Sequence, residues 1–390
     1  MPLFLLLPVI YLSFISLGLP DALLGAAWPE LHPAMGVSFD SAGIITFIIS
    51  CGTVVSSLMS DTLNRRFGTG LLTAGSVLLT AVALLGFSVS DRFWMLCCWA
   101  VPYGIGAGGV DAALNNYVAL HYTSRHMNWL HCFWGVGVAI SPYIMSGCLQ
   151  HQLGWQTGYR IVGCLQVILV AVLLLSLPLW RKATPPAAVG TADRVPCCGV
   201  KAAWRIPGVP MVLLGFFCYC AMEHTAILWS CSYLAFDRGM DPAMAARWGA
   251  MFFIGILTGR FLSGFCSNRV GDRWMIRIGI GLVLIGLIGV MLPVEAAALG
   301  GLLLLGFGCA PIYPAIIHAT PANFGAENSQ AIVGIQMASA YTGATITPPV
   351  FGWLAQRLDL WIFPFFLLLF VVPMLLALER LNRIVDRRGR

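Results

Sequence analysis

The sequence predicts an all-α membrane protein with twelve transmembrane helices in two pseudo-symmetric six-helix bundles. Of its 390 residues 59% are hydrophobic and 10% are charged, and the mean hydropathy is +0.85, whereas about a quarter of an ordinary soluble domain is charged. Hydrophobic runs of about 20 residues, enough for a helix to cross about 30 Å of hydrocarbon, recur along the whole chain. Features of the first half also return about 206 residues later.

Helices are expected in each run, because lipid offers the backbone of open sheets and loops no hydrogen-bond partners. The first run lacks a basic start and continues past Asp21 to Trp28, so we expect a retained span and not a cleaved signal peptide. The predicted spans are 3–27, 41–60, 70–89, 94–118, 129–149, 159–180, 210–234, 243–265, 275–292, 296–318, 329–353 and 360–379.

The basic residues predict the orientation, because Lys and Arg collect on the cytoplasmic side of a membrane. With these spans 17 of the 22 basic residues fall on one side, Arg260 among them, and five on the other. Both termini are therefore expected in the cytoplasm. This bias accounts for the net charge of +6, so we expect no nucleic-acid partner.

The longest stretch that is not apolar, residues 181–209, separates six spans from six. We therefore expect an N-terminal six-helix bundle over 1–180, a cytoplasmic linker over 181–209 and a C-terminal bundle with a short basic tail over 210–390. The linker contains Cys197-Cys198, where a modification or metal role is one alternative to an ordinary reduced pair. No Cys and His residues have a spacing suited to zinc, so neither a metal site nor a cofactor is expected.

Three features repeat between the halves. Gly137 and Pro142 in the fifth span stand 206 residues before Gly343 and Pro348 in the eleventh. Asp111 in the fourth span stands 207 residues before His318 in the tenth. The loops after the second and eighth spans also correspond, each with a short polar residue followed by arginines: Asp61, Arg65 and Arg66 in the first, and Asn268, Arg269 and Arg273 in the second. Halves repeated in this way build a site near the bilayer midplane.

Ionisable side chains within a span cost several kcal/mol unless they are solvated or paired, so each one is a functional hypothesis. Asp21 follows Pro20, which removes a backbone donor, and a broken helix that lines a cavity fits this pair. A structural cap near the outer surface is the alternative. Asp111 follows a glycine-rich stretch and has Asn115 four residues later on the same helix face. Burial favours the neutral carboxyl group, which would let Asp111 bind and release a proton; a buried hydrogen bond between helices is the alternative.

Further polar residues lie in other predicted spans. His131 and Trp134 share a face of the fifth span, and an aromatic plane beside hydrogen-bonding groups is common in sugar sites. The second half contributes Glu223, His224, His318 and Gln336, for which ordinary hydrogen bonds between helices are the alternative. The predicted substrate-binding and coupling residues are thus Asp21, Asp111, Asn115, His131, Trp134, Glu223, His224, His318 and Gln336.

Both arginine-bearing loops resemble the major facilitator superfamily signature, Gly-x-x-x-Asp-Arg-x-Gly-Arg-Arg, in a match that covers the whole chain. Ser57 and Asn64 stand where the signature has glycines, and Thr62 replaces a basic residue. The resemblance implies the major facilitator fold and a non-enzymatic secondary transporter that works by rocker-switch alternating access. It also implies a cytoplasmic gate formed by Asp61, Arg65, Arg66, Asn268, Arg269 and Arg273.

The block from Asp111 to Gly137 resembles the fucose permease branch of that superfamily, although Trp134 and Gly25 depart from its pattern. This resemblance implies proton symport of a sugar or a sugar-like polar solute, with Na⁺ as the other coupling ion considered. Short loops without glycosylation-bearing outer insertions suit a bacterial inner membrane, and we expect a monomer. The alternative is a proton-coupled drug or metabolite efflux antiporter, which the Gly137–Pro142 segment favours. A receptor or membrane enzyme would need a soluble domain or a catalytic constellation, and neither is visible in the sequence.

Overall fold

The computed structural model describes residues 2–38, 41–183, 200–240 and 242–388. Most of the predicted linker, including the Cys197-Cys198 pair, lies outside these residues. Within them every regular element is a helix, which confirms the predicted all-α fold class.

Twelve long helices in the described ranges correspond to the predicted spans, with the first formed by α1 and α2 together. The first seven helices are α1 (Pro2–Asp21), α2 (Leu23–Met35), α3 (Ala42–Phe67), α4 (Thr69–Ser88), α5 (Phe93–His121), α6 (Ser124–Gln150) and α7 (Gly154–Ala183). The remaining elements are α9 (Val200–Arg205), α10 (Val209–Ser232), η2 (Tyr233–Asp237), α11 (Pro242–Val270), α12 (Asp272–Met291), α13 (Glu295–His318), α14 (Thr320–Phe324), α15 (Ala326–Leu358), η3 (Leu360–Ile362) and α16 (Phe363–Arg388).

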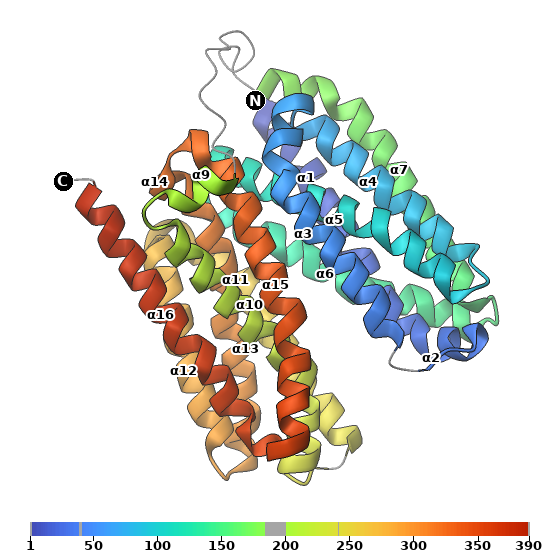
Figure 1. The fold of residues 1–390 in the computed structure, drawn as a ribbon, viewed down its shortest axis with the longest axis vertical. Coiled ribbons are helices and arrows are strands. Elements are labelled where there is room, and N and C mark those ends of the chain that lie inside the picture. The colour runs from blue at the N-terminus through green and yellow to red at the C-terminus, as the bar shows by residue number, and fades with distance from the viewer. Residues whose placement is uncertain (1, 39–40, 184–199, 241, 389–390) are drawn as a thin grey trace. The chain divides into compact units, whose positions relative to one another are not determined.

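The chain divides into two compact units. Unit 1 contains Met1–Tyr117 and Leu130–Cys197, and unit 2 contains Val118–Trp129 and Cys198–Arg390. In unit 1 the helix α7 packs against α4 and α1. In unit 2 the pairs α12/α13, α11/α13, α10/α15 and α10/α16 pack together, and the short helices α9 and α14 lie at one end of the bundle (Figure 1).

Glycines mark the same close contact in both units. A Cβ atom at Gly137 of α6 would collide with the carbonyl oxygen of Ile15 in α1, and one at Gly343 of α15 would lie 2.6 Å from the carbonyl oxygen of Phe217 in α10. Helix backbones approach this closely only where side chains are small. The repeat seen in the sequence therefore corresponds to a repeated helix pair.

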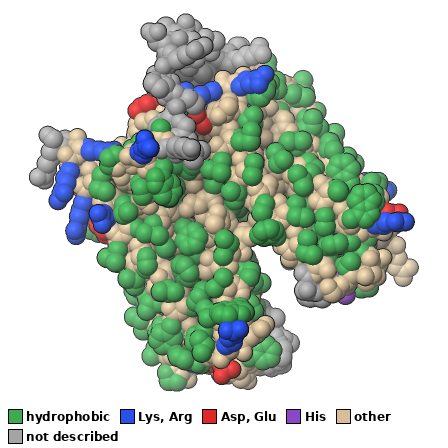
Figure 2. Space-filling view, viewed as in Figure 1, with side chains coloured by type: hydrophobic (Ala, Val, Ile, Leu, Met, Phe, Trp, Pro, Cys, Tyr) green, Lys and Arg blue, Asp and Glu red, His purple; other side chains and the backbone are tan. Residues whose placement is uncertain are grey.

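The surface is apolar along the helices. Leu175 and Tyr143 are 81% and 80% exposed, and in Figure 2 apolar side chains cover the sides of the helices while Lys and Arg collect near helix ends. Ten helices in the described part of the chain are long and apolar enough to cross a membrane by length and composition. The other two long helices, α11 and α15, carry polar residues that include Arg260 and Gln336.

Candidate functional site

Asp21 lies at a break in the first span, as the sequence predicts. Helix α1 ends at Asp21, Ala22 forms a turn, and α2 begins at Leu23. Pro20 explains the break, because its ring lacks an N–H and disrupts the last turn of the helix. The Asp21 side chain is exposed, so its carboxylate is accessible from outside the packed helices of unit 1.

Two aromatic side chains hold the Asp21 carboxylate. The hydroxyl of Tyr103 in α5 donates to Oδ1 over 2.9 Å, and the indole Nε1–H of Trp134 in α6 donates to Oδ2 over 2.9 Å. Each carboxylate oxygen has a second lone pair left over, because an ionised carboxylate accepts about four hydrogen bonds. The group is therefore positioned and still able to accept a hydrogen bond from a solute.

Close packing of α1 against α6 brings Trp134 to Asp21. A Cβ atom at Gly18, one turn before the end of α1, would collide with the carbonyl oxygen of Trp134. Gly137, one turn further along α6, meets Ile15 in the same way. Small residues at both positions let the two backbones touch, which places the indole beside the end of α1.

A second cluster joins Asp111, Asn115 and His131. The amide Nδ2 of Asn115 donates to Oδ1 of Asp111 over 2.7 Å, and its Oδ1 lies 3.0 Å from Nε2 of His131. With the amide in this orientation, Nε2 of His131 is the donor. The three residues are 3%, 0% and 5% exposed, so this is a buried polar chain that connects α5 with α6.

The two clusters share helices α5 and α6. Tyr103 and Asp111 are eight residues apart on α5, about 12 Å along the axis at 1.5 Å per residue, and His131 is three residues before Trp134 on α6. The ring of Phe14 from α1 packs edge-on against His131 with centroids 5.5 Å apart. Unit 1 thus places an exposed carboxylate and a buried one in successive layers between the same three helices.

In unit 2 the predicted residue Glu223 forms a buried ion pair with Arg260. Nη2 of Arg260 in α11 lies 3.3 Å from Oε1 of Glu223 in α10, and the residues are 4% and 5% exposed. The hydroxyl of Tyr219 lies 2.8 Å from the same carboxylate oxygen and 3.0 Å from the carbonyl oxygen of Cys309. The guanidinium of Arg260 is buried, because a carboxylate inside unit 2 compensates its charge, and its assignment to the cytoplasmic side stays a prediction.

The other predicted residues of unit 2 do not join this ion pair in the described contacts. His224 is exposed and its Nδ1 lies 3.1 Å from the carbonyl oxygen of Cys220 in its own helix. Gln336 is fully buried, and its Oε1 accepts from Thr320 over 3.1 Å. His318, at the end of α13, lies with Nδ1 2.6 Å from Oδ2 of Asp272.

Asp272 and His318 contact the start of α6 within unit 2. Nε2 of His318 lies 3.2 Å from the carbonyl oxygen of Tyr122, and the hydroxyl of Ser124 donates to Oδ1 of Asp272 over 2.8 Å. The backbone N–H of Arg125 donates to Oδ1 of Asn268 over 3.1 Å. One corner of the chain, residues 122–125, is thus held by groups at the ends of α11 and α13 and the start of α12.

The predicted gate residues make both local contacts and contacts with other helices. Asp61 is paired with Arg65 in α3, where Nε and Oδ1 are 3.1 Å apart, and Arg66 lies over the ring of Phe67. In unit 2, Arg273 is paired with Asp386 of α16 at 2.6 Å, while Arg269 is exposed. Of the predicted six, Asn268 is the residue that contacts the corner at Arg125.

Sequence reasoning overlooked Tyr103, Tyr219, Arg260 and Asp272. The signal for Arg260 was present, because it lies inside the predicted span 243–265 and the rule applied to Asp21 covers it equally. Tyr219 stands four residues before Glu223, on the same helix face. Among the described residues no group of three His, Cys, Asp or Glu side chains is arranged to hold a metal ion.

Comparison with known proteins shows the family. The Major Facilitator Superfamily family model matches residues 10–241 and 211–386, so this chain belongs to that superfamily of membrane transporters. An uncharacterised transporter of Yersinia pestis is 24% identical and the match covers 85% of each chain. A Mycolicibacterium smegmatis efflux pump is 26% identical over 59% of this chain and 53% of its own. The solved structure of FucP in the outward conformation matches with a TM-score of 0.77 at 16% identity, over 98% of this chain and 99% of that chain.

These matches confirm the predicted major facilitator fold and a multi-pass membrane protein. The family and fold are those of transporters that move small molecules across membranes, and neither indicates a catalytic activity.

Proposed function

We propose that this protein is a proton symporter for a small neutral polar solute, a sugar or sugar-like compound. The observation that carries the proposal is the exposed Asp21 carboxylate held by the Tyr103 hydroxyl and the Trp134 indole. Such a carboxylate can accept hydrogen bonds from solute hydroxyls, and the aromatic rings beside it offer the apolar faces on which a sugar ring packs. The likeness in fold to FucP, described as a fucose:proton symporter of Escherichia coli, is consistent with this proposal.

The proton is assigned to the second layer of unit 1. Asp111 is buried and accepts a hydrogen bond from Asn115, whose amide oxygen lies 3.0 Å from Nε2 of His131. Burial favours the neutral form of a carboxyl group, so the charge of such a group depends on a bound proton. Asp21 would thus bind the solute and Asp111 the proton. Glu223, His224, His318 and Gln336 are proposed to contribute from unit 2.

A second function, proton-coupled efflux, is favoured by a different observation. The buried Glu223–Arg260 pair is a charged centre in unit 2, and one relative is described as an efflux pump. An antiporter would exchange a proton for an outgoing solute at such a centre. The relatives and structural neighbours thus include both an efflux pump and a symporter, and transport measurements distinguish import from export.

The experiment that decides is proton movement in proteoliposomes. The purified full chain is reconstituted with a pH dye inside and another outside, and sugars, polyols and cationic dyes are added in turn. External alkalinisation on addition of one neutral sugar is expected. Silence with every sugar, together with proton release when a cationic dye is expelled, would replace symport by efflux.

Orientation and assembly are part of the proposal. We propose a monomer in a bacterial inner membrane with both termini in the cytoplasm, a linker over 181–209, and bundles over 1–180 and 210–390. The gate is proposed to comprise Asp61, Arg65, Arg66, Asn268, Arg269 and Arg273, with H⁺ as the coupling ion. Reporter fusions at residue 390 and within 184–199 are expected to show cytoplasmic activity, and periplasmic activity at either position would reverse the topology.

A further inference from the structure

The break in α1 leaves one backbone acceptor without its usual donor. In an α-helix the carbonyl oxygen of residue 16 accepts the N–H of residue 20. Pro20 has no N–H, so the Ser16 carbonyl loses this bond within the helix, and the ring also crowds it. A buried carbonyl without a donor costs free energy, and in lipid no water is available to pair with it.

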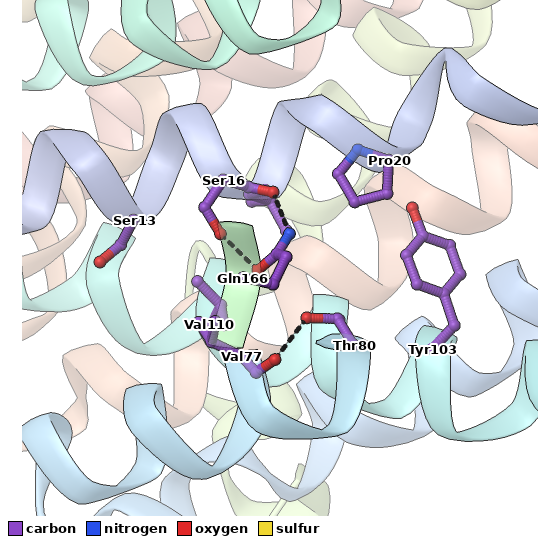
Figure 3. A pocket seen from close by; sticks show the side chains of 9 residues that line it. Ser13, Ser16, Pro20, Val77, Thr80, Tyr103, Val110 and Gln166 are labelled. Atoms are coloured by element: carbon purple, nitrogen blue, oxygen red, sulfur yellow. Dashed lines mark hydrogen bonds between the residues drawn. The ribbon is translucent and has the colours of Figure 1, made fainter. Parts of the chain in front are cut away.

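Gln166 of α7 takes the place of the missing donor. Its Nε2 lies 2.6 Å from the Ser16 carbonyl oxygen, and its Oε1 accepts from the Ser16 hydroxyl over 2.6 Å. Ser16 and Gln166 are 6% and 1% exposed. The amide therefore makes two hydrogen bonds with residue 16, as Figure 3 shows.

The two hydrogen bonds between Gln166 and Ser16 lie five residues before Asp21 on α1. A small cavity of about 10 Å³ is lined by Ser16, Pro20, Tyr103 and Gln166, among others. A space of this size holds one water molecule at most, so it does not accommodate a solute. In Figure 3 the Tyr103 hydroxyl points past Pro20 toward the end of α1, where it reaches Asp21. The same small space is thus lined by Gln166 and by Tyr103, one of the two residues that hold the carboxylate.

We propose that Gln166 is a positioning residue for Asp21. By replacing the hydrogen bond that Pro20 removes, Gln166 fixes the last turn of α1 against α7 and keeps the Asp21 carboxylate within reach of Tyr103 and Trp134. The inference rests on the proposed function only in calling Asp21 a solute-binding group. The effect of Gln166 on the position of Asp21 depends on contacts within unit 1 alone.

The test uses a readout that requires no transported solute. Near-ultraviolet circular dichroism of the purified full chain is recorded with and without Asp21→Asn, and the difference reports the Tyr103 and Trp134 rings that contact the carboxylate. Gln166→Met has nearly the same length but no amide, so the difference caused by Asp21→Asn is expected to disappear in that background. Gln156→Leu, also on α7 and outside these contacts, is the matched control and is expected to leave the difference intact.

Pro20→Ala provides the decisive second variant. Alanine returns an N–H to position 20, so the Ser16 carbonyl regains its donor and Gln166→Met is expected to have no further effect in the Pro20→Ala background. Ser16→Ala removes only the hydroxyl contact and is expected to retain the Asp21 signal. Persistence of the Asp21 difference in folded Gln166→Met, or equal effects of Gln166→Met with and without Pro20, would overturn the proposal. Absence of sugar transport in every variant and in the parent would refute symport and leave these outcomes unchanged.

Discussion

Arg260 lies 3.3 Å from Glu223 inside unit 2, and neither residue is accessible from outside. Removing two charges from water is costly, and their mutual attraction compensates only when both are present. The pair therefore affects the stability of unit 2 and is also a candidate centre for proton coupling. Experiment can separate these two roles.

Glu223→Leu is expected to destabilise the protein by about 3 to 5 kcal/mol, because Arg260 would remain buried without its counter-charge. The double variant Glu223→Leu/Arg260→Met removes both charges, and most of the lost stability is expected to return. Thermal unfolding in detergent measures both effects, with Glu295→Leu at the exposed start of α13 as control. Normal proton-coupled transport by the stable double variant would show that the pair has a structural role alone.

The helices were predictable because the membrane imposes their length. The prediction of 70–89 for α4 compares with Thr69–Ser88, and 296–318 for α13 compares with Glu295–His318. The differences occur where a helix continues beyond the apolar run: α3 reaches Phe67 and α16 reaches Arg388, past the predicted ends at 60 and 379. The hydropathy of a sequence predicts only the part of a helix that crosses the hydrocarbon. The hydrogen bonds of the helix can continue into the polar sequence beyond that part.

The site was predictable only within single helices. The spacing of Asp111 and Asn115 placed them on one face, and the structure shows the hydrogen bond between them. Their link to His131 and the link from Asp21 to Tyr103 depend on how three helices pack, and no local pattern encodes that packing. His318 illustrates the same limit, because its partner Asp272 lies 46 residues away at the start of another helix.

Asp21→Asn is expected to weaken the apparent affinity for the transported solute by about ten- to a hundredfold. Hydrogen bonds to a charged group contribute about 1.5 to 3 kcal/mol, and the amide keeps the shape of the side chain without its charge. The measurement is uptake against concentration for whichever sugar produces the proton signal. Asp91→Asn, an exposed aspartate of unit 1, is the control, and equal affinities for the two variants would remove Asp21 from the solute site.

Asp111→Asn is expected to abolish accumulation driven by a proton gradient while solute exchange continues. The amide occupies the same volume and still accepts a hydrogen bond from Asn115, but it cannot release or bind a proton at neutral pH. Uptake with an imposed pH gradient and counterflow without one separate the two activities. Accumulation by Asp111→Asn at the level of the parent protein would assign proton coupling to another group.

His318→Ala is expected to loosen the corner at residues 122–125. Both imidazole nitrogens of His318 face acceptors, Asp272 on one side and the Tyr122 carbonyl on the other, and only the doubly protonated ring can donate to both. Hydrogen exchange followed by mass spectrometry is expected to show faster exchange in peptides spanning 118–129 for His318→Ala and for Asp272→Asn. Arg273→Gln breaks an exposed pair with Asp386, and such pairs contribute about 0 to 1 kcal/mol, so little change is expected there. Equal exchange in all three variants would mean that packing, and not the His318–Asp272 contact, holds the corner.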